Sequence, residues 1–310
     1  METLLILSLA IVIDLILGEP PNIIHPVAWM GKIILFLKKG CLFQNHIARF
    51  IYGLLIVLIT LGLFTVPVYF LLPYLKSLNS VAYVIVGVLF LKSTFSLTGL
   101  RRAALGIKKL LLRDKLDEAR FELRSLVSRD TRNLPKSSLI SATVESVAEN
   151  TSDSFIAPLF YFLLLGIPGA IAYRVVNTLD AVIGYHGEYE YLGKFASRLD
   201  DVLNFIPARL TALFLVLATF LTRRDGRISW QVLRSEHGKT ESPNAGWPMA
   251  AVAGALNISL EKVGDYKLGN MSPPPTIEAI DNSLQLTQIA MLVWALLCFT
   301  TEVIYFVFTT

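Results

Sequence analysis

Three acidic side chains stand four residues apart in the stretch TVESVAENTSDS, just before an apolar run. They are Glu145, Glu149 and Asp153. Along a helix, each step of four residues rotates the side chain by only about 40°, so all three carboxylates would lie on one stripe. Carboxylates placed in this way repel one another unless a cation lies between them, and Mg²⁺ binds one or two carboxylates together with phosphate oxygens. The stripe therefore predicts a metal site, and a solvated acidic helix face is the alternative.

Two further polar clusters follow along the chain. The segment YRVVNTLDAVIGY places Arg174, Asn177 and Asp180 three residues apart, which puts them on one helical face among apolar neighbours. The segment GKFASRLDDVLNFIPARL then carries a denser polar set within sixteen positions, namely Lys194, Arg198, Asp200, Asp201, Asn204 and Arg209. Such a combination suits a phosphate group held by Arg and Lys and a metal ion held by Asp and Glu.

Some residues of the second cluster also have structural interpretations. Arg198 and Asp201 could form a buried ion pair with each other. Arg209 could extend its charged end to the membrane interface. The segment nevertheless carries more polar groups into an apolar helix than pairing among themselves readily explains, so the clusters favour a ligand site.

Two more segments hold candidate substrate-binding residues. Asp14 lies just before the proline-rich stretch GEPPNIIHP and His25 lies within it, at an expected membrane boundary, although a single histidine is more often structural than a ligand or base. His237, Ser242 and Asn244 lie in the polar loop SEHGKTESPNAGWP, which we interpret as facing the substrate. The sequence contains no Walker loop, GxSxG elbow or zinc motif, so any ATP would bind without the common P-loop.

The composition indicates an integral membrane protein. Hydrophobic residues make up 54% of the 310 residues and charged residues only 17%, against about 25% charged in soluble domains, and the mean hydropathy is +0.58. Residues 51–75, 81–100 and 284–308 form apolar runs long enough to cross a bilayer, and residues 206–221 form a fourth. The opening apolar stretch, which contains Asp14, is expected to be a retained first helix.

The apolar run 155–173 differs from the others because Pro158, Gly166, Pro168 and Gly169 interrupt it. Broken helices at membrane depth are tolerated mainly where protein or a water-filled cavity covers them. This run therefore predicts a buried or re-entrant element.

The polar segment DKLDEARFELRSLVSRDTRNL predicts an amphipathic helix. Its apolar residues recur at helical spacing, and they are Leu116, Ala119, Leu123, Leu126 and Val127. We expect this helix to end near Pro135 and to lie on the membrane surface or against another cytoplasmic helix.

Together these elements predict an all-α fold, a polytopic integral membrane helical bundle with cytoplasmic amphipathic helices and a broken or re-entrant apolar element. A single membrane-embedded domain is expected over residues 1–310, since no linker divides the chain. Basic residues at membrane edges place residues 101–154 and 223–283 in the cytoplasm. They also explain the net charge of +4 without a nucleic-acid partner. We expect the polar clusters to meet in a cavity that opens to the cytoplasm.

Several separate motifs in order carry a family resemblance: HPVAWMGK, RDTRNL, ESVAENTSDSFIAPLFYFLLLGIPGAIAYRVVNTLDAVIGY, SRLDDVLNFIPARLTA and SPNAGWPMAAVAGAL. With them, nearly the whole chain closely resembles the CbiB/CobD family of cobalamin biosynthesis, the adenosylcobinamide-phosphate synthases. The resemblance implies an ATP- and Mg²⁺-dependent amide ligation between the free propionate of adenosylcobyric or cobyric acid and the amine of aminopropanol phosphate. The chain departs from the usual family pattern at Ser154, Leu179 and Val182, mostly by conservative exchanges.

This chemistry assigns hypothetical roles to the polar clusters. Mg²⁺ ligands are expected among the acids Glu145, Glu149, Asp153, Asp180, Asp200 and Asp201, of which Glu149, Asp153 and Asp201 are the catalytic candidates. The phosphates of ATP or aminopropanol phosphate would be bound by Arg174, Lys194, Arg198 and Arg209. The orienting amides would be Asn150, Asn177 and Asn204. The corrinoid would contact Asp14, His25, His237, Ser242 and Asn244.

Two rival functions would use the same residues. One is a Mg²⁺-dependent membrane transferase that acts on a lipid or nucleotide diphosphate. The other is a non-enzymatic transporter or membrane sensor, in which the buried acids form an ion pathway. For the ligase, the expected partners are the corrinoid, an amino-alcohol phosphate, ATP, membrane lipid and later enzymes of the pathway. Its expected location is the cell membrane, as a multi-pass protein with the active site facing the cytoplasm.

Overall fold

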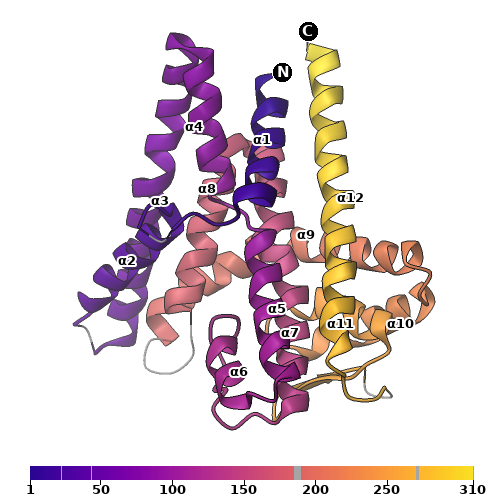
Figure 1. Ribbon diagram of the computed structural model, residues 1–310. Helices are drawn as coiled ribbons and strands as arrows, with labels where there is room; N and C mark the ends of the chain where they lie inside the picture. The colour runs from indigo at the N-terminus through magenta and orange to yellow at the C-terminus, as the bar shows by residue number, and fades with distance from the viewer. Residues whose placement is uncertain (22, 43, 185–189, 270–271, 310) are drawn as a thin grey trace. The chain divides into compact units, whose positions relative to one another are not determined.

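The computed structural model describes residues 1–21, 23–42, 44–184, 190–269 and 272–309 (Figure 1). Within these ranges the regular elements are helices apart from one two-stranded hairpin, so the predicted all-α fold class is confirmed. Four described helical stretches are long and apolar enough to cross a membrane: His46–Leu78, Lys136–Ile183, Glu190–Leu221 and Glu278–Phe308. The second of these is one continuous stretch built from two α-helices and a π-turn.

The helices are grouped into two compact units. The first unit comprises Met1–Ser96, Ala157–Asn204 and Cys298–Thr310. The second comprises Leu97–Ile156 and Phe205–Leu297. The expectation of a single domain stays a prediction.

The first unit is built from apolar helices. They are α1 (Glu2–Leu17), α2 (Pro26–Lys39), α3 (His46–Leu78), α4 (Ser80–Lys92), α8 (Ala157–Ile183), the first part of α9 (Glu190–Leu221) and the end of α12 (Glu278–Thr309). Helix α1 packs along α4, and α8 contacts α2, α3 and α4. Asparagine side chains start two of these helices, since Asn45 accepts a hydrogen bond from the Ile47 N–H (2.8 Å) and Asn79 from the Val81 N–H (2.8 Å).

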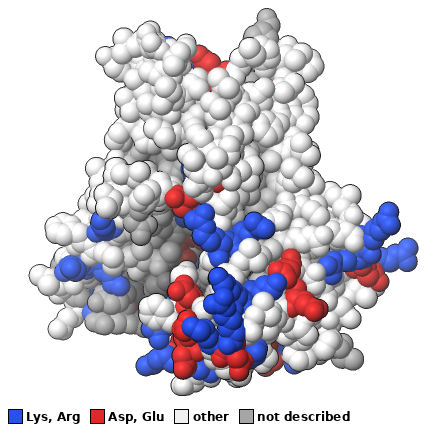
Figure 2. Space-filling model, viewed as in Figure 1, with Lys and Arg blue, Asp and Glu red and all other residues white. Residues whose placement is uncertain are grey.

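The second unit contains the shorter and more polar elements. They are α5 (Thr98–Leu112), α6 (Leu116–Leu123), α7 (Lys136–Thr151), a π-turn (Ser152–Ile156), α10 (Gly226–Glu236), a 3₁₀ turn (His237–Lys239), α11 (Gly246–Leu256), β1 (Leu260–Lys262) and β2 (Tyr266–Leu268), with parts of α9 and α12. Helix α7 contacts α5, α6, α11 and β1, and α10 packs closely on α11. In Figure 2, charged side chains gather over α5 and α6, whereas the visible surfaces of α3 and α4 are mainly uncharged.

The apolar run 81–100 does not form the predicted membrane span. Helix α4 ends at Lys92 after 13 residues, short of the roughly 20 needed to cross. Beyond it, the hydroxyls of Ser93 and Thr94 donate to the carbonyls of Phe90 and Leu91 (2.7 Å each), which turns the chain before α5 begins. The sequence prediction was wrong here because the run was treated as one helix despite its polar centre.

The run 155–173 is a broken helix, as predicted. A π-turn over Ser152–Ile156 precedes α8, and the backbone at Gly166 leaves the helical region with φ 68° and ψ −163°. That positive φ requires glycine, and Pro168, two residues later, has no backbone N–H to continue the helical hydrogen bonds.

The predicted amphipathic helix before Pro135 is shorter than expected. Helix α6 covers only Leu116–Leu123. The chain beyond it folds back, because the Thr131 hydroxyl donates to the Arg120 carbonyl (2.7 Å) and Arg120 Nε donates to the Leu134 carbonyl (3.1 Å). These tertiary contacts end the helix before the apolar pattern does.

Two glycines of α3 provide a test of the packing in the first unit. A Cβ at Gly53 would lie 1.9 Å from the Leu192 carbonyl oxygen of α9, whereas a Cβ at Gly62 would meet nothing within 4 Å. We expect Gly53→Ala to lower the free energy of unfolding by about 1–3 kcal/mol through overpacking. Gly62→Ala should leave stability unchanged or slightly raised. Thermal unfolding of both variants in detergent measures the difference, and equal Tm values would contradict the close approach.

Candidate functional site

Three aspartates from α8 and α9 form an acidic group in the first unit, here called the aspartate cluster: Asp180, Asp200 and Asp201. The three carboxylates interact electrostatically with one another. Asn204, one turn after Asp200 and only 3% exposed, donates to Asp200 Oδ2 (2.8 Å). Asn204 itself accepts a hydrogen bond from the buried Tyr173 hydroxyl (2.8 Å). Helical spacing on α9 and packing against α8 therefore fix the position of Asp200 together.

The predicted face of α8 contributes to the same cluster. Arg174 Nη1 donates to Asn177 Oδ1 (3.2 Å), and Asn177 hydrogen-bonds Asp200. Asp180, a further turn along α8, hydrogen-bonds Ser197 of α9. The structure thus brings together the polar residues that the sequence placed on one face of α8 and those it placed at the start of α9.

Two glycines allow this close approach of the helices. A Cβ at Gly193 would lie 1.8 Å from the Ile183 carbonyl oxygen, and one at Gly184 would lie 2.0 Å from the Asp180 carboxylate. Any larger residue would separate the end of α8 from the start of α9. The connecting residues 185–189 lie outside the described part of the chain.

The basic residues of α9 lie at the edge of the aspartate cluster. Arg198 Nη1 is 3.6 Å from Asp201 Oδ2, and the side chain of Arg198 is 74% exposed. Lys194 is exposed and lies over the Tyr191 ring, 5.5 Å from its centroid. The ion pair that the sequence offered as an alternative is therefore present, but it is exposed and long, and such pairs contribute little to stability. A phosphate group could replace it at low cost.

The aspartate cluster has the features expected of a cation site completed by a ligand. Neither Asp180 nor Asp200 forms an ion pair with a described Lys, Arg or His side chain, and Asp200 Oδ1 is buried without a hydrogen-bond partner among the described residues. Within the same described ranges, no three His, Cys, Asp or Glu side chains gather closely enough to hold a metal ion by themselves. Mg²⁺ bound by one or two carboxylates and by phosphate oxygens fits both observations.

Glu145, in the second unit, has a different environment from the aspartate cluster. It is 2% exposed and forms an ion pair with Arg129. It also accepts hydrogen bonds from the Ser141 hydroxyl (2.6 Å) and the Tyr266 hydroxyl (2.9 Å), and Ser141 Oγ accepts the Glu261 N–H (2.8 Å). Burial and the neighbouring carboxylate of Glu145 raise the pKa of Tyr266. These contacts are those of an anchor between α7, the loop before it and the β1–β2 hairpin, and a role for Glu145 as a metal ligand stays a prediction.

The other residues of the acidic stripe do not continue one regular helix. Glu149 lies on α7, one turn after Glu145, but α7 ends at Thr151 and Asp153 lies in the π-turn. Asn150 Nδ2 is turned back to its own helix, where it donates to the Ser146 carbonyl (2.9 Å). The π-turn shifts the phase of the helix, so the predicted spacing of four holds for the two glutamates only. Such turns are frequent at functional sites.

Arg209 and the polar loop form a second group of predicted residues, also in the second unit. Arg209 Nη1 donates to the Asn244 side-chain oxygen (3.0 Å). Its guanidinium lies over the rings of Phe205 (3.5 Å) and Trp247 (4.5 Å), and Trp247 packs against His237, with ring centroids 4.1 Å apart. Trp247 Nε1 is buried and has no hydrogen-bond partner among the described residues. Stacking therefore holds a guanidinium beside an unsatisfied donor, which suits an anionic ligand.

Ser242 shapes the loop of this second group. Its hydroxyl accepts hydrogen bonds from the backbone N–H groups of Asn244 (3.2 Å) and Ala245 (3.4 Å), just before α11. His237 Nδ1 contacts the Leu233 carbonyl (2.9 Å). Because a carbonyl only accepts, Nδ1 carries a proton. Ser242 thus contacts backbone in this structure, and its proposed contact with substrate stays a prediction.

The predicted pair Asp14 and His25 belongs to a buried network in the first unit. Lys92 Nζ lies 2.9 Å from Asp14 Oδ1 and 3.0 Å from Glu19 Oε1. His25 Nδ1 accepts the Val27 N–H at the start of α2 (3.1 Å), so Nε2 carries the proton and donates to Glu19 (2.8 Å). Burial alone would raise the pKa of Glu19, but hydrogen bonds from His25 and Ser96 and the charge of Lys92 lower it to about 2.

Sequence reasoning missed several residues that these groups depend on. Lys92 had a detectable signal, since a single charge inside an apolar run is a site hypothesis by itself. Trp247 stands beside the predicted loop residues and could have been included with them. Arg129 and Tyr266 had no such signal, because their importance arises only from contact with Glu145 across 16 and 121 positions of sequence.

Comparisons with known proteins agree on one family. A family model described as CobD/Cbib protein matches residues 7–296. The Cobalamin biosynthesis protein CobD of Dehalococcoides mccartyi (strain CBDB1) is 53% identical over 306 residues, which cover 99% of each chain. The Probable cobalamin biosynthesis protein CobD of Methanothermobacter thermautotrophicus is 38% identical, over 96% of this chain and 97% of the relative. The protein of that name from Pyrococcus furiosus is 42% identical, over 86% and 88%. No solved structure gives a significant match.

The anchor role of Glu145 can be tested by removing its charge. Glu145→Gln leaves the Arg129 guanidinium without its counter-charge, and breaking a buried pair in this way costs about 3–5 kcal/mol. The matched control is Glu118→Gln, since Glu118 is exposed and within the described ranges forms an ion pair only with Lys115 (2.7 Å), and such pairs contribute about 0–1 kcal/mol. Thermal unfolding in detergent should show a large loss of Tm for the first variant only. Equal losses would contradict the anchor.

The low pKa of Glu19 predicts a dependence of stability on pH. A carboxyl with a pKa of about 2 in the folded protein and an ordinary value of 4.5 stabilises the fold above pH 4.5. That contribution is lost as the pH falls from 4.5 towards 2, because protonation is then favoured in the unfolded chain first. We expect Glu19→Gln to lower Tm at neutral pH and to reduce the fall of Tm across this window. An unchanged pH profile in the variant would show that the pKa of Glu19 is not shifted.

Proposed function

This chain belongs to the CobD/CbiB family of cobalamin biosynthesis proteins, and we propose that it is the ATP-dependent amide ligase of the pathway. In this proposal it joins adenosylcobyric or cobyric acid to aminopropanol phosphate and gives adenosylcobinamide phosphate. The site faces the cytoplasm, where ATP and both substrates are supplied. The family and its pathway are the premise, the reaction is what the family resemblance implies, and the chemistry of the site supports it.

The observation that supports the reaction best is the aspartate cluster. Asp180 and Asp200 lie between largely apolar helices without a cationic partner among the described residues, and one oxygen of Asp200 is buried and unsatisfied. A ligand that carries both a cation and phosphate oxygens would neutralise these carboxylates and satisfy the buried oxygen, and Mg²⁺-ATP is such a ligand. Asn177 and Asn204 hydrogen-bond Asp200 and so help to orient it.

The reaction needs activation of a carboxylate. Hydroxide is a poor leaving group, so the propionate of the corrinoid first takes the γ-phosphoryl group of ATP, and ADP leaves. The amine of aminopropanol phosphate then attacks the acyl carbon, inorganic phosphate leaves and the nitrogen loses a proton. Mg²⁺ would supply neutralisation of the charge on the phosphates, as in other phosphoryl transfers.

In this proposal, different residues of the first unit bind the metal, bind phosphate and accept a proton. Asp180 and Asp200 would hold the metal, and Arg174 and Arg198 bind phosphate oxygens. Asp201 accepts the proton of the amine, since its side chain is 22% exposed and therefore reachable by a substrate. Lys194 is the further phosphate-binding candidate at the exposed edge.

The second unit contributes separate binding residues in this proposal. Arg209, whose guanidinium lies over the rings of Phe205 and Trp247, binds a phosphate group through the guanidinium nitrogens that Asn244 does not contact. His237 and Asn244 contact the corrinoid. Glu149 and Asp153 keep their proposed roles as catalytic acids and metal ligands, because the π-turn gives Asp153 a position that a regular helix would not.

One assay of the detergent-purified protein tests this function. It measures phosphate release from Mg²⁺-ATP with each substrate omitted in turn and identifies the corrinoid product by mass. We expect amide formation only with all three substrates. Asp200→Asn and Asp201→Asn should lower its rate at least about a hundredfold, the effect typical of losing one preorganised charge contact. Asp130→Asn is the control, since Asp130 is exposed and, among the described residues, forms an ion pair only with Arg132.

Two outcomes would contradict the proposed ligase or its site. Turnover of a lipid or nucleotide diphosphate without ATP would support a membrane transferase. Wild-type amide formation in Asp200→Asn and Asp201→Asn would remove the aspartate cluster from the reaction.

A further inference from the structure

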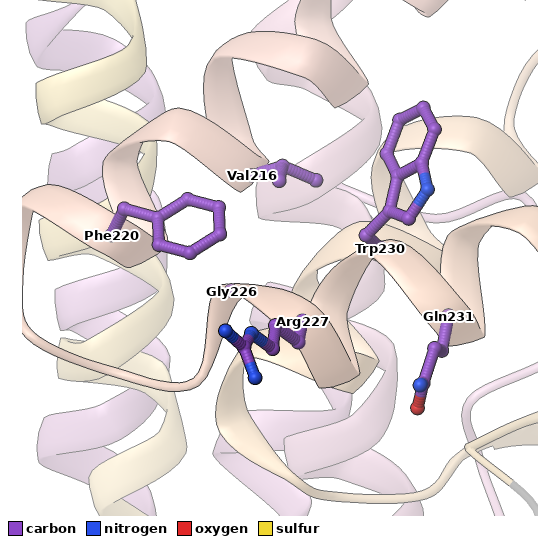
Figure 3. A pocket seen from close by; sticks show the side chains of 6 residues that line it. All are labelled: Val216, Phe220, Gly226, Arg227, Trp230 and Gln231. Carbon is purple, nitrogen blue, oxygen red and sulfur yellow. The ribbon is translucent and has the colours of Figure 1, made fainter.

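A groove of about 450 Å³ lies in the second unit, where the end of α9 meets the start of α10 (Figure 3). It is lined by Val216, Phe220, Gly226, Arg227, Trp230 and Gln231. In Figure 3 the ring of Phe220 points into the groove and the indole of Trp230 rises on one side, while the polar ends of Arg227 and Gln231 extend on the other. The groove is therefore apolar with one basic and one amide group at its edge.

The turn between the two helices forms this groove. Asp225 caps α10 by accepting hydrogen bonds from the N–H groups of Arg227 (2.9 Å) and Ile228 (3.2 Å). A Cβ at Gly226 would lie 2.4 Å from the Phe220 ring, so glycine lets the chain pass directly beneath the ring. Because Asp225 occupies the helix N-terminus, the groove is not an anion site of that terminus.

The apolar wall of the groove continues the exposed face of a candidate membrane span. Leu213, Leu217, Phe220 and Leu221 are each more than 40% exposed and recur at the spacing of one helical face. They lie in the charge-free last part of α9, one of the four candidate spans. Exposed apolar side chains on a span face acyl chains, so the wall leads from the bilayer into the groove. Trp230, 45% exposed, has the amphipathic ring that is enriched at membrane interfaces.

Basic residues surround the polar end of the groove. Arg223, Arg224 and Arg227 fall within five positions directly after α9. Arg224 Nη2 is held by the Asn282 side chain (2.8 Å), whereas Arg227 is exposed and lines the groove. The only acid in this turn, Asp225, is engaged in the helix cap. The turn between α9 and α10 thus has a net positive charge, which is complementary to an anionic head group.

We propose that this groove binds one anionic glycerophospholipid, with an acyl chain against Val216, Phe220 and Trp230 and the phosphate on Arg227. Gln231 donates to the same head group. The lipid stabilises α10 at the membrane surface. A small soluble anion lacks the apolar part that the lining of the groove requires, so the structure favours the lipid.

Fluorescence quenching in vesicles tests the proposal. The purified full chain is reconstituted in phosphatidylcholine with a minor fraction of either phosphatidylglycerol or phosphatidylcholine brominated on one acyl chain. The signal is the quenching of Trp230 alone, obtained as the difference in tryptophan quenching between the wild-type protein and Trp230→Phe. We expect brominated phosphatidylglycerol to quench Trp230 at lower mole fraction than brominated phosphatidylcholine.

Two arginines of α10 form the matched pair. Arg227→Gln should raise the phosphatidylglycerol needed for half-maximal quenching about fivefold, the effect of one arginine near a membrane surface. Arg234→Gln, the same change at an exposed residue of α10 outside the groove, should leave that value within about twofold of wild type. Val216→Phe, which fills the groove, should reduce quenching by both lipids.

Three results would contradict the proposed lipid site. Equal quenching by the two lipids would mean that the head group is not selected. Equal effects of the two arginine variants would indicate general attraction of basic residues to an anionic surface. Unchanged quenching in Val216→Phe would place the acyl chain outside the groove. None of these readouts uses turnover, so the result does not depend on the proposed ligase activity.

Discussion

An ionised side chain packed among apolar helices must have a partner, because its removal from water costs several kcal/mol that only close opposite charge or hydrogen bonds offset. Two parts of the molecule show how this constraint shapes the chain. Lys92 ends α4 where it reaches Asp14 and Glu19. Glu145 joins α7 to a loop through Arg129 and to the hairpin through Tyr266. The end of α4 and the contacts of α7 therefore lie where buried charges are neutralised.

The same constraint explains how much of the fold the sequence could predict. Long apolar runs required only a count of residues, and α3, α9 and α12 contain the predicted spans 51–75, 206–221 and 284–308. The run 81–100 failed because an average over apolar residues hides one lysine, and the Glu19 that pairs with that lysine is 73 positions away. The helix α6 was overpredicted for a similar reason, since contacts with residues beyond it, not its own pattern, set its end.

In the candidate site too, contacts between residues close in sequence were predictable and contacts between distant residues were not. Helical spacing placed Arg174 beside Asn177 correctly, because residues three or four apart on a helix are neighbours in any fold. The bond from Tyr173 to Asn204 joins two helices, and its existence depends on how these helices pack. Spacing also misled at the π-turn, where one changed hydrogen-bond register moves Asp153 off the stripe that a regular helix would give.

The presence or absence of a neighbouring cation distinguishes the acids with a structural role from those that we propose to bind a ligand. Glu145 and Asp14 were both candidates by residue type, yet each has a cation beside it, Arg129 for Glu145 and Lys92 for Asp14. Asp180 and Asp200 interact with each other and with Asp201 without such a cation among the described residues. Folding alone offers no reason to keep like charges together in a largely apolar setting. A cation that binds together with the substrate would provide such a reason. The reaction would then take place where the described part of the protein leaves its own negative charges without a counter-charge.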